Sequence, residues 1–175
     1  MSPPVRQFAL FIHLTCSVGW IGAVLAYLGL GVSAVSSESA ATVRGAWIAM
    51  EVVGWYVLVP LAVGSWLTGL VMAIGTKWGL FRHWWVLLAF VLTTLAAAVL
   101  VTHMPDVSSV AESVRTAGDA EVKGYGGDLF HAVLALGLLL SIQVLNLYKP
   151  PGVTRYGWRK SNEERSRRAA RKAAA

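Results

Sequence analysis

The chain has 175 residues, of which 56% are hydrophobic and only 14% are charged, and its mean hydropathy is +0.60. A soluble domain carries nearer a quarter charged residues, so this composition excludes an ordinary water-soluble fold and favours a bilayer as the solvent. The one cysteine, Cys16, excludes an intramolecular disulfide framework. Because it lies inside an apolar run, we interpret it as a small packing residue.

Four apolar stretches follow one another along the chain, at about residues 8–32, 52–74, 84–102 and 129–148. Each is close to the ~20 residues that a helix needs to cross ~30 Å of hydrocarbon. Backbone polar groups must be satisfied within the segment in lipid, so the sequence predicts helices rather than strands. The predicted fold class is all-α, a polytopic membrane protein with an antiparallel bundle of four transmembrane helices in residues 1–148 and a basic tail in residues 149–175.

The first stretch is the longest of the four, and the second contains a proline. Residues 8–32 form a run of about 25 residues, well beyond the ~7–15 apolar residues of a cleaved signal peptide. We therefore expect the first helix to be retained. The second stretch contains Pro60, which we expect to kink its helix or to rely on neighbouring helices for support.

The basic residues are distributed unequally between the two sides of the predicted membrane. The tail from Lys149 onwards carries nine of the fifteen Lys and Arg residues, and Arg6, Lys77 and Arg82 fall on the same side. Cytoplasmic segments carry the excess of Lys and Arg, so we expect both termini in the cytoplasm of a bacterial inner membrane. A long loop over residues 104–128 should face outward. We interpret the tail as a solvated segment or frayed helix near anionic lipid headgroups, and no nucleic-acid-binding module is visible.

Four histidines lie in or beside the predicted helices: His13, His83, His103 and His131. The topology places His13 and His83 near the inner face and His103 and His131 near the outer face. His83 and His103 are 20 residues apart, roughly 30 Å of helix rise, so they cannot share one cofactor. Two imidazoles from different helices at one depth are the arrangement that holds b-type haem. The sequence therefore predicts haem b, with His13 and His83 as inner ligands and His103 and His131 as outer ligands.

Alternatives to haem ligation remain open for each histidine. His83 and His103 point about 200° apart on an ideal helix, whereas a helix with two interior haems needs both ligands on one face. His83 then becomes an interfacial residue, His103 a residue at a helix C-terminus, and His131 a shallow residue near Asp128. His13 lies deepest, on the most polar stripe of its helix, and is a functional candidate by default.

A second kind of site is possible on the outer face. The segment THMPD supplies His103, Met104 and Asp106, and His131 follows on the next helix. These ligands suit copper or zinc. No phosphate loop or nucleophile triad is visible, so a redox-active protein would be an electron-transfer protein rather than an enzyme.

Three stretches carry a resemblance to known proteins: HLTCSVGWIGAVLAYL, GLFRHWWVLLAFVLTTLAAAVLVTHMP and YKPPGVTRYGW. They resemble a group of small four-helix bacterial membrane proteins, common in actinobacteria, over most of residues 7–158. This resemblance implies the fold but no activity. A looser similarity, in architecture and intramembrane histidines, is to the four-helix dihaem cytochromes b of the b561 type, although the separation of His83 and His103 departs from their spacing.

The leading prediction is therefore a small b-haem membrane protein, acting as a redox carrier or a haem-based sensor. Its expected partners are the lipid bilayer and either a membrane redox protein or a second copy of the chain. One alternative is a non-catalytic membrane subunit that packs against a partner and holds no cofactor. A further alternative is a binder of copper or zinc on the outer face.

Overall fold

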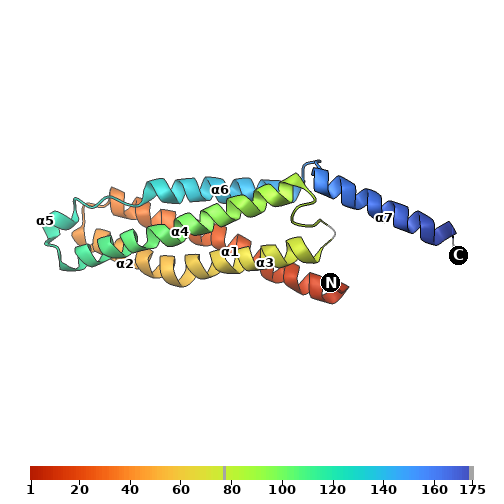
Figure 1. Cartoon of the computed structure of the whole chain (residues 1–175). Helices are drawn as coiled ribbons and strands as arrows, with labels where there is room; N and C mark the ends of the chain where they lie inside the picture. The colour runs from red at the N-terminus through yellow and green to blue at the C-terminus, as the bar shows by residue number, and fades with distance from the viewer. Residues whose placement is uncertain (77, 174–175) are drawn as a thin grey trace.

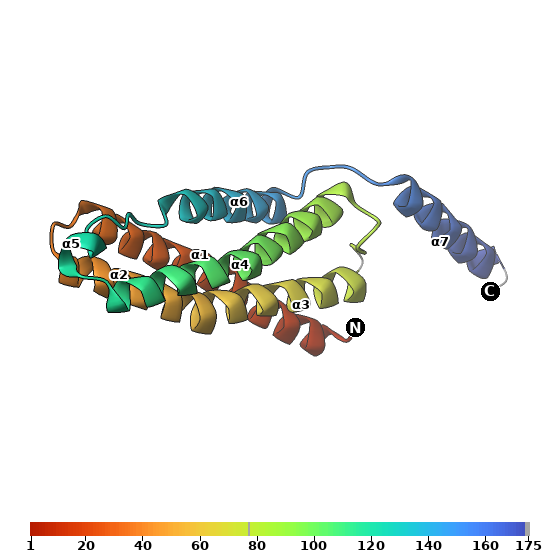
Figure 2. The ribbon, with the colours of Figure 1, turned by 60° about the vertical axis from the view of Figure 1, so that its left-hand side comes forward.

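The computed structural model describes residues 1–76 and 78–173, and their regular secondary structure is helical apart from one isolated bridge between His83 and Val153. Lys77, one of the basic residues expected on the cytoplasmic side, lies outside the described residues. The helices form an elongated up-and-down bundle (Figure 1). They comprise α1 (Pro3–Ser36), a continuous helix of α2 (Ala40–Val53), η1 (Gly54–Leu58) and α3 (Val59–Gly75), then α4 (Trp84–Thr116) and α6 (Leu129–Tyr148). The short α5 (Asp119–Val122) closes one end, and α7 (Arg155–Ala173) leaves the other end, as Figure 2 also shows.

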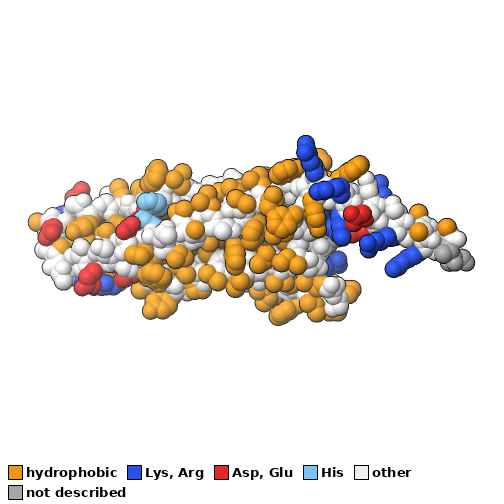
Figure 3. Space-filling model, in the orientation of Figure 1, with side chains coloured by type: hydrophobic (Ala, Val, Ile, Leu, Met, Phe, Trp, Pro, Cys, Tyr) orange, Lys and Arg blue, Asp and Glu red, His pale blue; other side chains and the backbone are white. Residues whose placement is uncertain are grey.

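Four of these helices are long and apolar enough to cross a membrane: Pro3–Ser36, Ala40–Gly75, Trp84–Thr116 and Leu129–Tyr148. The large apolar side chains face outward as a broad band around the middle of the bundle (Figure 3), whereas many buried positions are alanines, including Ala62 and Ala96. Small residues let helix backbones approach closely in lipid, where burying large side chains brings no hydrophobic gain. The predicted all-α, four-helix membrane fold is confirmed.

The second and third helices extend well beyond the ends that hydropathy predicts. The second begins at Ala40, and α4 continues through Pro105 to Thr116. The first part of the expected outer loop, residues 104–116, is therefore helical. The reason is tertiary packing: the polar sequence after Pro105 still places Val107 and Val114 on a buried face, and the extended part of α4 packs against α2.

The turn before Pro60 is π-helical rather than sharply kinked. Pro60 has no N–H to donate to the preceding turn, and η1 accommodates this locally, with the Val59 N–H bonded to the Gly54 carbonyl. A side chain at Gly54 would collide with the Met104 thioether, so α4 approaches η1 closely at this point. Such single-turn π-bulges are a known way for a continuous helix to absorb a local irregularity.

The basic tail begins with an anchored segment and then becomes helical. The Thr154 N–H donates to the Arg82 carbonyl at 3.0 Å, and the Trp84 N–H donates to the Gly152 carbonyl at 3.3 Å. An ion pair of 2.7 Å joins Arg82 to Glu164. The start of α7 is thus fastened to the start of α4, and the rest of α7 projects away from the bundle (Figures 1 and 2).

Candidate metal centre

Asp128 is held at the start of α6 by a close contact between its loop and α1. A side chain at Gly127 would collide with the backbone of Gly31 on α1, so only glycine fits this contact. The Trp47 indole N–H donates to the Gly126 carbonyl at 2.8 Å and fixes the same loop to α2. These contacts hold Asp128, the residue before α6, beside α1.

The Asp128 carboxylate joins three helices. Its Oδ2 accepts hydrogen bonds from the Tyr27 hydroxyl on α1 at 3.0 Å and from His103 Nε2 on α4 at 2.7 Å. Its Oδ1 accepts from His131 Nδ1, one turn into α6, at 2.9 Å. The carboxylate is only 8% exposed, whereas the His103 side chain is 20% and the His131 side chain 46% exposed. The cluster is therefore buried at the carboxylate and open on the imidazole side.

The two imidazoles of this cluster lie face to face. Their ring centroids are 3.8 Å apart and the rings are inclined by 30°. One ligand atom from each of His103, Asp128 and His131 lies within 4.8 Å of the other two. Two nitrogen donors and one oxygen donor at these separations can surround a single small ion, and they leave a fourth position for water.

The charge of Asp128 is maintained despite its burial. Burial alone would raise the pKa of this carboxyl, but the hydrogen bonds from His103, His131 and Tyr27 and the charge of His103 favour the ionised form. The net effect is a pKa below the ordinary value of an aspartate. The cluster therefore presents a carboxylate anion to any cation that enters.

Two other ligands that the sequence offered behave differently. Met104 is 1% exposed and packs in the core against η1, so it lies outside the group of possible ligands. Asp106 is on the surface, and its Oδ2 is 3.8 Å from His103 Nδ1. Asp106 is thus placed to orient the His103 ring rather than to join the three ligands.

The structure brings the outer pair of histidines together but places the inner pair on different features. His13 Nδ1 lies 3.0 Å from the Thr68 hydroxyl of α3. His83 caps the start of α4, with its Nδ1 2.7 Å from the Trp78 carbonyl and its ring edge-on to the Trp78 indole. His13 lines a cavity at the basic end of the bundle, and His83 is not among the described residues that line it.

Haem at the outer pair would require the two imidazoles to move apart from the arrangement in the structure. Two axial imidazoles hold haem iron between them, with the macrocycle in the gap. Face-to-face rings at 3.8 Å leave no space for a macrocycle, and both nitrogens that bond to Asp128 point towards one carboxylate. Haem b stays a prediction at both pairs of histidines.

Sequence reasoning found both imidazoles of the cluster but not its centre. It treated Asp128 only as a neighbour of His131 and did not identify Tyr27 as a partner. Asp128 could have been recognised from its position three residues before His131, because the residue before a helix lies beside the side chains of its first turn. No comparable sequence signal pairs Tyr27 with Asp128, since they are 101 residues apart.

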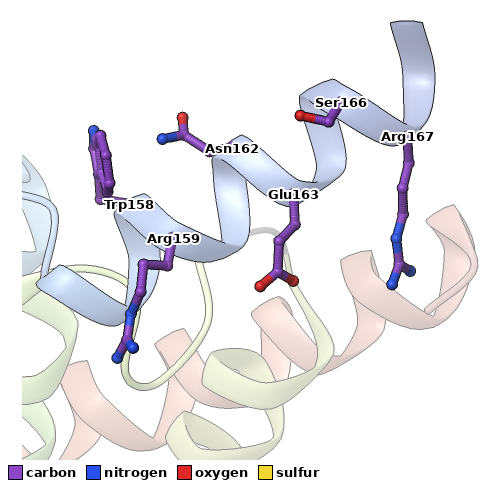
Figure 4. Close-up of a pocket in the computed structure, with 6 residues that line it drawn as sticks. All are labelled: Trp158, Arg159, Asn162, Glu163, Ser166 and Arg167. Atoms are coloured by element: carbon purple, nitrogen blue, oxygen red, sulfur yellow. The ribbon is translucent and has the colours of Figure 1, made fainter. Parts of the chain in front are cut away.

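A separate hollow on α7 lacks the features of a binding site. Figure 4 shows its lining side chains, which extend to two sides of one helix: Trp158, Arg159, Asn162, Glu163, Ser166 and Arg167. Within the described part of the chain, no other element contributes to this lining. A groove formed by one helix surface cannot enclose a ligand as a binding pocket does.

Comparison of the chain with models of known protein families, with curated proteins and with solved structures finds no match. The likeness to small actinobacterial membrane proteins and to b561-type cytochromes therefore stays a prediction. The function has to be argued from the geometry of the sites.

Proposed function

We propose that this protein binds a divalent transition-metal ion of the zinc or copper class at His103, Asp128 and His131. The observation that supports this most directly is the convergence of two imidazoles and one carboxylate within 4.8 Å, from two helices and the loop between them. Imidazole and carboxylate donors are a common ligand set for zinc, and imidazole also suits copper. The site lies where the apolar band meets the acidic end of the bundle, at a histidine surface visible in Figure 3.

Metal binding at this cluster would replace protons. In the structure His103 Nε2 and His131 Nδ1 each lie against a carboxylate oxygen, as proton donors. To bind a metal through these atoms, each ring moves its proton to its other nitrogen. For His103 that nitrogen faces Asp106 at 3.8 Å, a carboxylate suited to accept the proton's hydrogen bond and to hold the ring in place.

Tyr27 has a supporting role in this proposal. Its hydroxyl donates to Asp128 Oδ2 at 3.0 Å and so orients the carboxylate from α1 without supplying a ligand. Groups of this kind typically contribute about 10–100-fold to metal affinity. The same bond couples the position of α1 to the occupancy of the site.

The experiment is a metal titration of protein purified in detergent without a histidine tag. We expect one zinc or copper ion per chain by elemental analysis. Tyr27→Phe should weaken binding about tenfold, and His103→Ala, His131→Ala and Asp128→Asn should weaken it by a larger factor because each removes a ligand. His83→Ala is the matched control, because that imidazole contacts Trp78 at the other end of the bundle.

Two results would contradict the proposal. One is a protein that retains no stoichiometric metal after titration with zinc and with copper. The other is equal affinity in the His83→Ala and His131→Ala proteins. In either case the cluster would be a purely structural hydrogen-bonded clamp between α1, α4 and α6.

A further inference from the structure

A cavity of about 770 Å³ lies at the basic end of the bundle, far along the helices from the metal centre. All four long helices contribute to it: His13 from α1, Ser65 from α3, Phe90 from α4 and Gln143 from α6 are among its lining residues. Its volume is in the ~300–1,000 Å³ range of small-molecule sites. Arg6 and Lys149 stand at the end nearest the chain terminus and α7.

The hydrogen bonds around His13 determine which ring nitrogen is free. The Thr68 hydroxyl donates its one proton to the Gly64 carbonyl at 2.6 Å. Thr68 Oγ1 must then accept from His13 Nδ1–H across their 3.0 Å contact. His13 Nε2 is left without a proton, as a hydrogen-bond acceptor on a ring that lines the cavity. Gly69 makes room for the ring, since a Cβ there would lie 3.2 Å from His13 Cε1.

The nearby hydroxyls of Ser17 and Ser65 already donate hydrogen bonds within the protein. The Ser17 hydroxyl donates to the His13 carbonyl at 2.7 Å, so the Ser65 hydroxyl is the donor across the 2.9 Å contact between Ser17 and Ser65. These bonds fix α1 against α3 below the His13 ring. With these hydroxyls engaged, His13 Nε2 is the acceptor that α1 offers to a ligand in the cavity.

Helix α6 offers hydrogen-bond donors to the same cavity. Gln143 and Asn146 are one helical turn apart, half-buried and part of the cavity lining. No side-chain hydrogen bond joins either amide to another of the described residues. Amides in apolar surroundings are costly without partners, and polar residues inside membrane helices commonly mark ligand sites. Their N–H groups are donors available to a molecule in the cavity.

Aromatic side chains form part of the remaining lining. Trp66 and Phe90 pack with ring centroids 5.7 Å apart, and Trp85 lines the cavity beside them. Aromatic faces of this kind accommodate a flat ring by offset or edge contacts. The cavity therefore combines a hydrogen-bond acceptor, amide donors and aromatic side chains, with Arg6 and Lys149 at one end.

We propose that this cavity binds a lipophilic quinone and its quinol. A quinol hydroxyl would donate to His13 Nε2, the Gln143 amide would donate to the other ring oxygen, and the apolar tail would extend into the bilayer. Haem fits this lining less well, because His83 does not supply a second ligand and a porphyrin face would leave the two amides unpaired. This proposal is independent of the metal centre.

The test is a titration of the detergent-purified full chain with a short-chain benzoquinone and with a short-chain naphthoquinone, followed by quenching of tryptophan fluorescence. We expect saturable quenching by at least one of the two. His13→Ala and Gln143→Leu should each weaken it about tenfold, the loss of about one hydrogen bond. The matched control is Asn162→Leu, an amide on α7 that is not among the residues lining the cavity and whose loss should leave the affinity unchanged.

Two variants are used because His13→Ala also removes the bond to Thr68, whereas Gln143→Leu removes no hydrogen bond that the structure contains. Unsaturable quenching by both quinones, or the same affinity in Gln143→Leu as in the unchanged protein, would overturn the proposal. A Soret band in the purified protein that His13→Ala removes would also overturn it, in favour of haem in this cavity.

Discussion

At the scale of single residues, the proposed metal site depends on one carboxylate that accepts hydrogen bonds from three partners. Asp128 is ionised although it is nearly buried, because Tyr27, His103 and His131 all donate to it. A buried charge without such partners would be strongly destabilising. The carboxylate therefore connects stability and metal binding, which makes it the residue whose substitution is most informative.

The depressed pKa of Asp128 predicts how stability depends on pH. A carboxyl whose folded-state pKa lies below its unfolded value contributes stability that is present above the unfolded value, about 3.9, and is lost as the pH falls through the folded value. Asp128→Asn should therefore lower the free energy of unfolding by about 1–3 kcal/mol near pH 7. The difference from the unchanged protein should shrink below about pH 4.

The measurement is unfolding in detergent, followed by circular dichroism from pH 7 to pH 3 without added metal. His103, His131 and Tyr27 contact the Asp128 carboxylate, and Asp106 lies beside His103. His83→Ala is measured in parallel as a control that lies outside this network. An Asp128→Asn protein whose deficit stays constant across this pH range would show that the ionised carboxylate is not the source of the stability.

The depth expected for His103 and His131 agrees with the adjacent rings in the structure, whereas the angle expected for His83 does not apply. Depth along a helix can be counted from the sequence, and it correctly placed His103 beside His131. The expected angle of about 200° between His83 and His103 assumed that His83 belongs to the helix. It is instead the residue before α4, with extended backbone angles of φ −128° and ψ 135°, so the preceding turn and the Trp78 carbonyl determine where its ring points.

At the scale of elements, hydropathy predicted the lipid-crossing parts of the helices but not their full lengths. The continuation of α4 after Pro105 is polar on one side and buried on the other, with Val107 1% and Ala111 0% exposed. A window average over such a segment registers its serines and charges rather than its periodicity. The contacts that make it helical are with α2, which is distant in sequence.

The contact between the α6 loop and α1 gives a prediction with a closely matched control. Gly127→Ala would force a methyl group into the backbone of Gly31, whereas a Cβ at Gly126 would have nothing within 4 Å. We expect Gly127→Ala to move Asp128 away from Tyr27, to cost about 1–3 kcal/mol and to weaken metal binding. Gly126→Ala should leave both properties unchanged.

Thermal unfolding and metal titration of these two variants provide the check. Both glycines have ordinary negative or extended backbone angles, because positive φ occurs only at Gly79 and Lys149 among the described residues. An alanine at either position is thus unstrained in itself, and only the contact differs. Equal behaviour of the two variants would mean that the loop does not need its close approach to α1.

At the scale of the whole molecule, the two ends of the bundle differ in charge. Figure 3 shows acidic groups at the α5 end and basic groups around α7, on either side of the apolar band. Two of the basic residues at the acidic end are paired there, Arg44 with Asp119 and Arg115 with Glu51 and Glu112. The excess of positive charge thus lies at the end that carries both termini.

This asymmetry predicts that both termini are cytoplasmic. A reporter that fluoresces only in the cytoplasm should be bright when fused after Ala175 and dark when fused after Gly118, which lies between α4 and α5 where a side chain would meet open space. The metal centre would then belong to the outer half of the protein and the quinone cavity to the inner half. Bright signal from the Gly118 fusion would reverse both assignments.

The length of α4 determines how an ion reaches the metal centre. Its 33 residues correspond to about 50 Å of helix, whereas the hydrocarbon core is about 30 Å thick. If α4 enters the hydrocarbon near Trp84, about two fifths of the helix would extend beyond it, and His103 would lie near that boundary. The space between this part of α4 and α2 is filled by side chains such as Val43, Val107 and Val114, each at most 1% exposed. An ion bound at the proposed site would therefore be expected to enter from the side, past the half-exposed ring of His131.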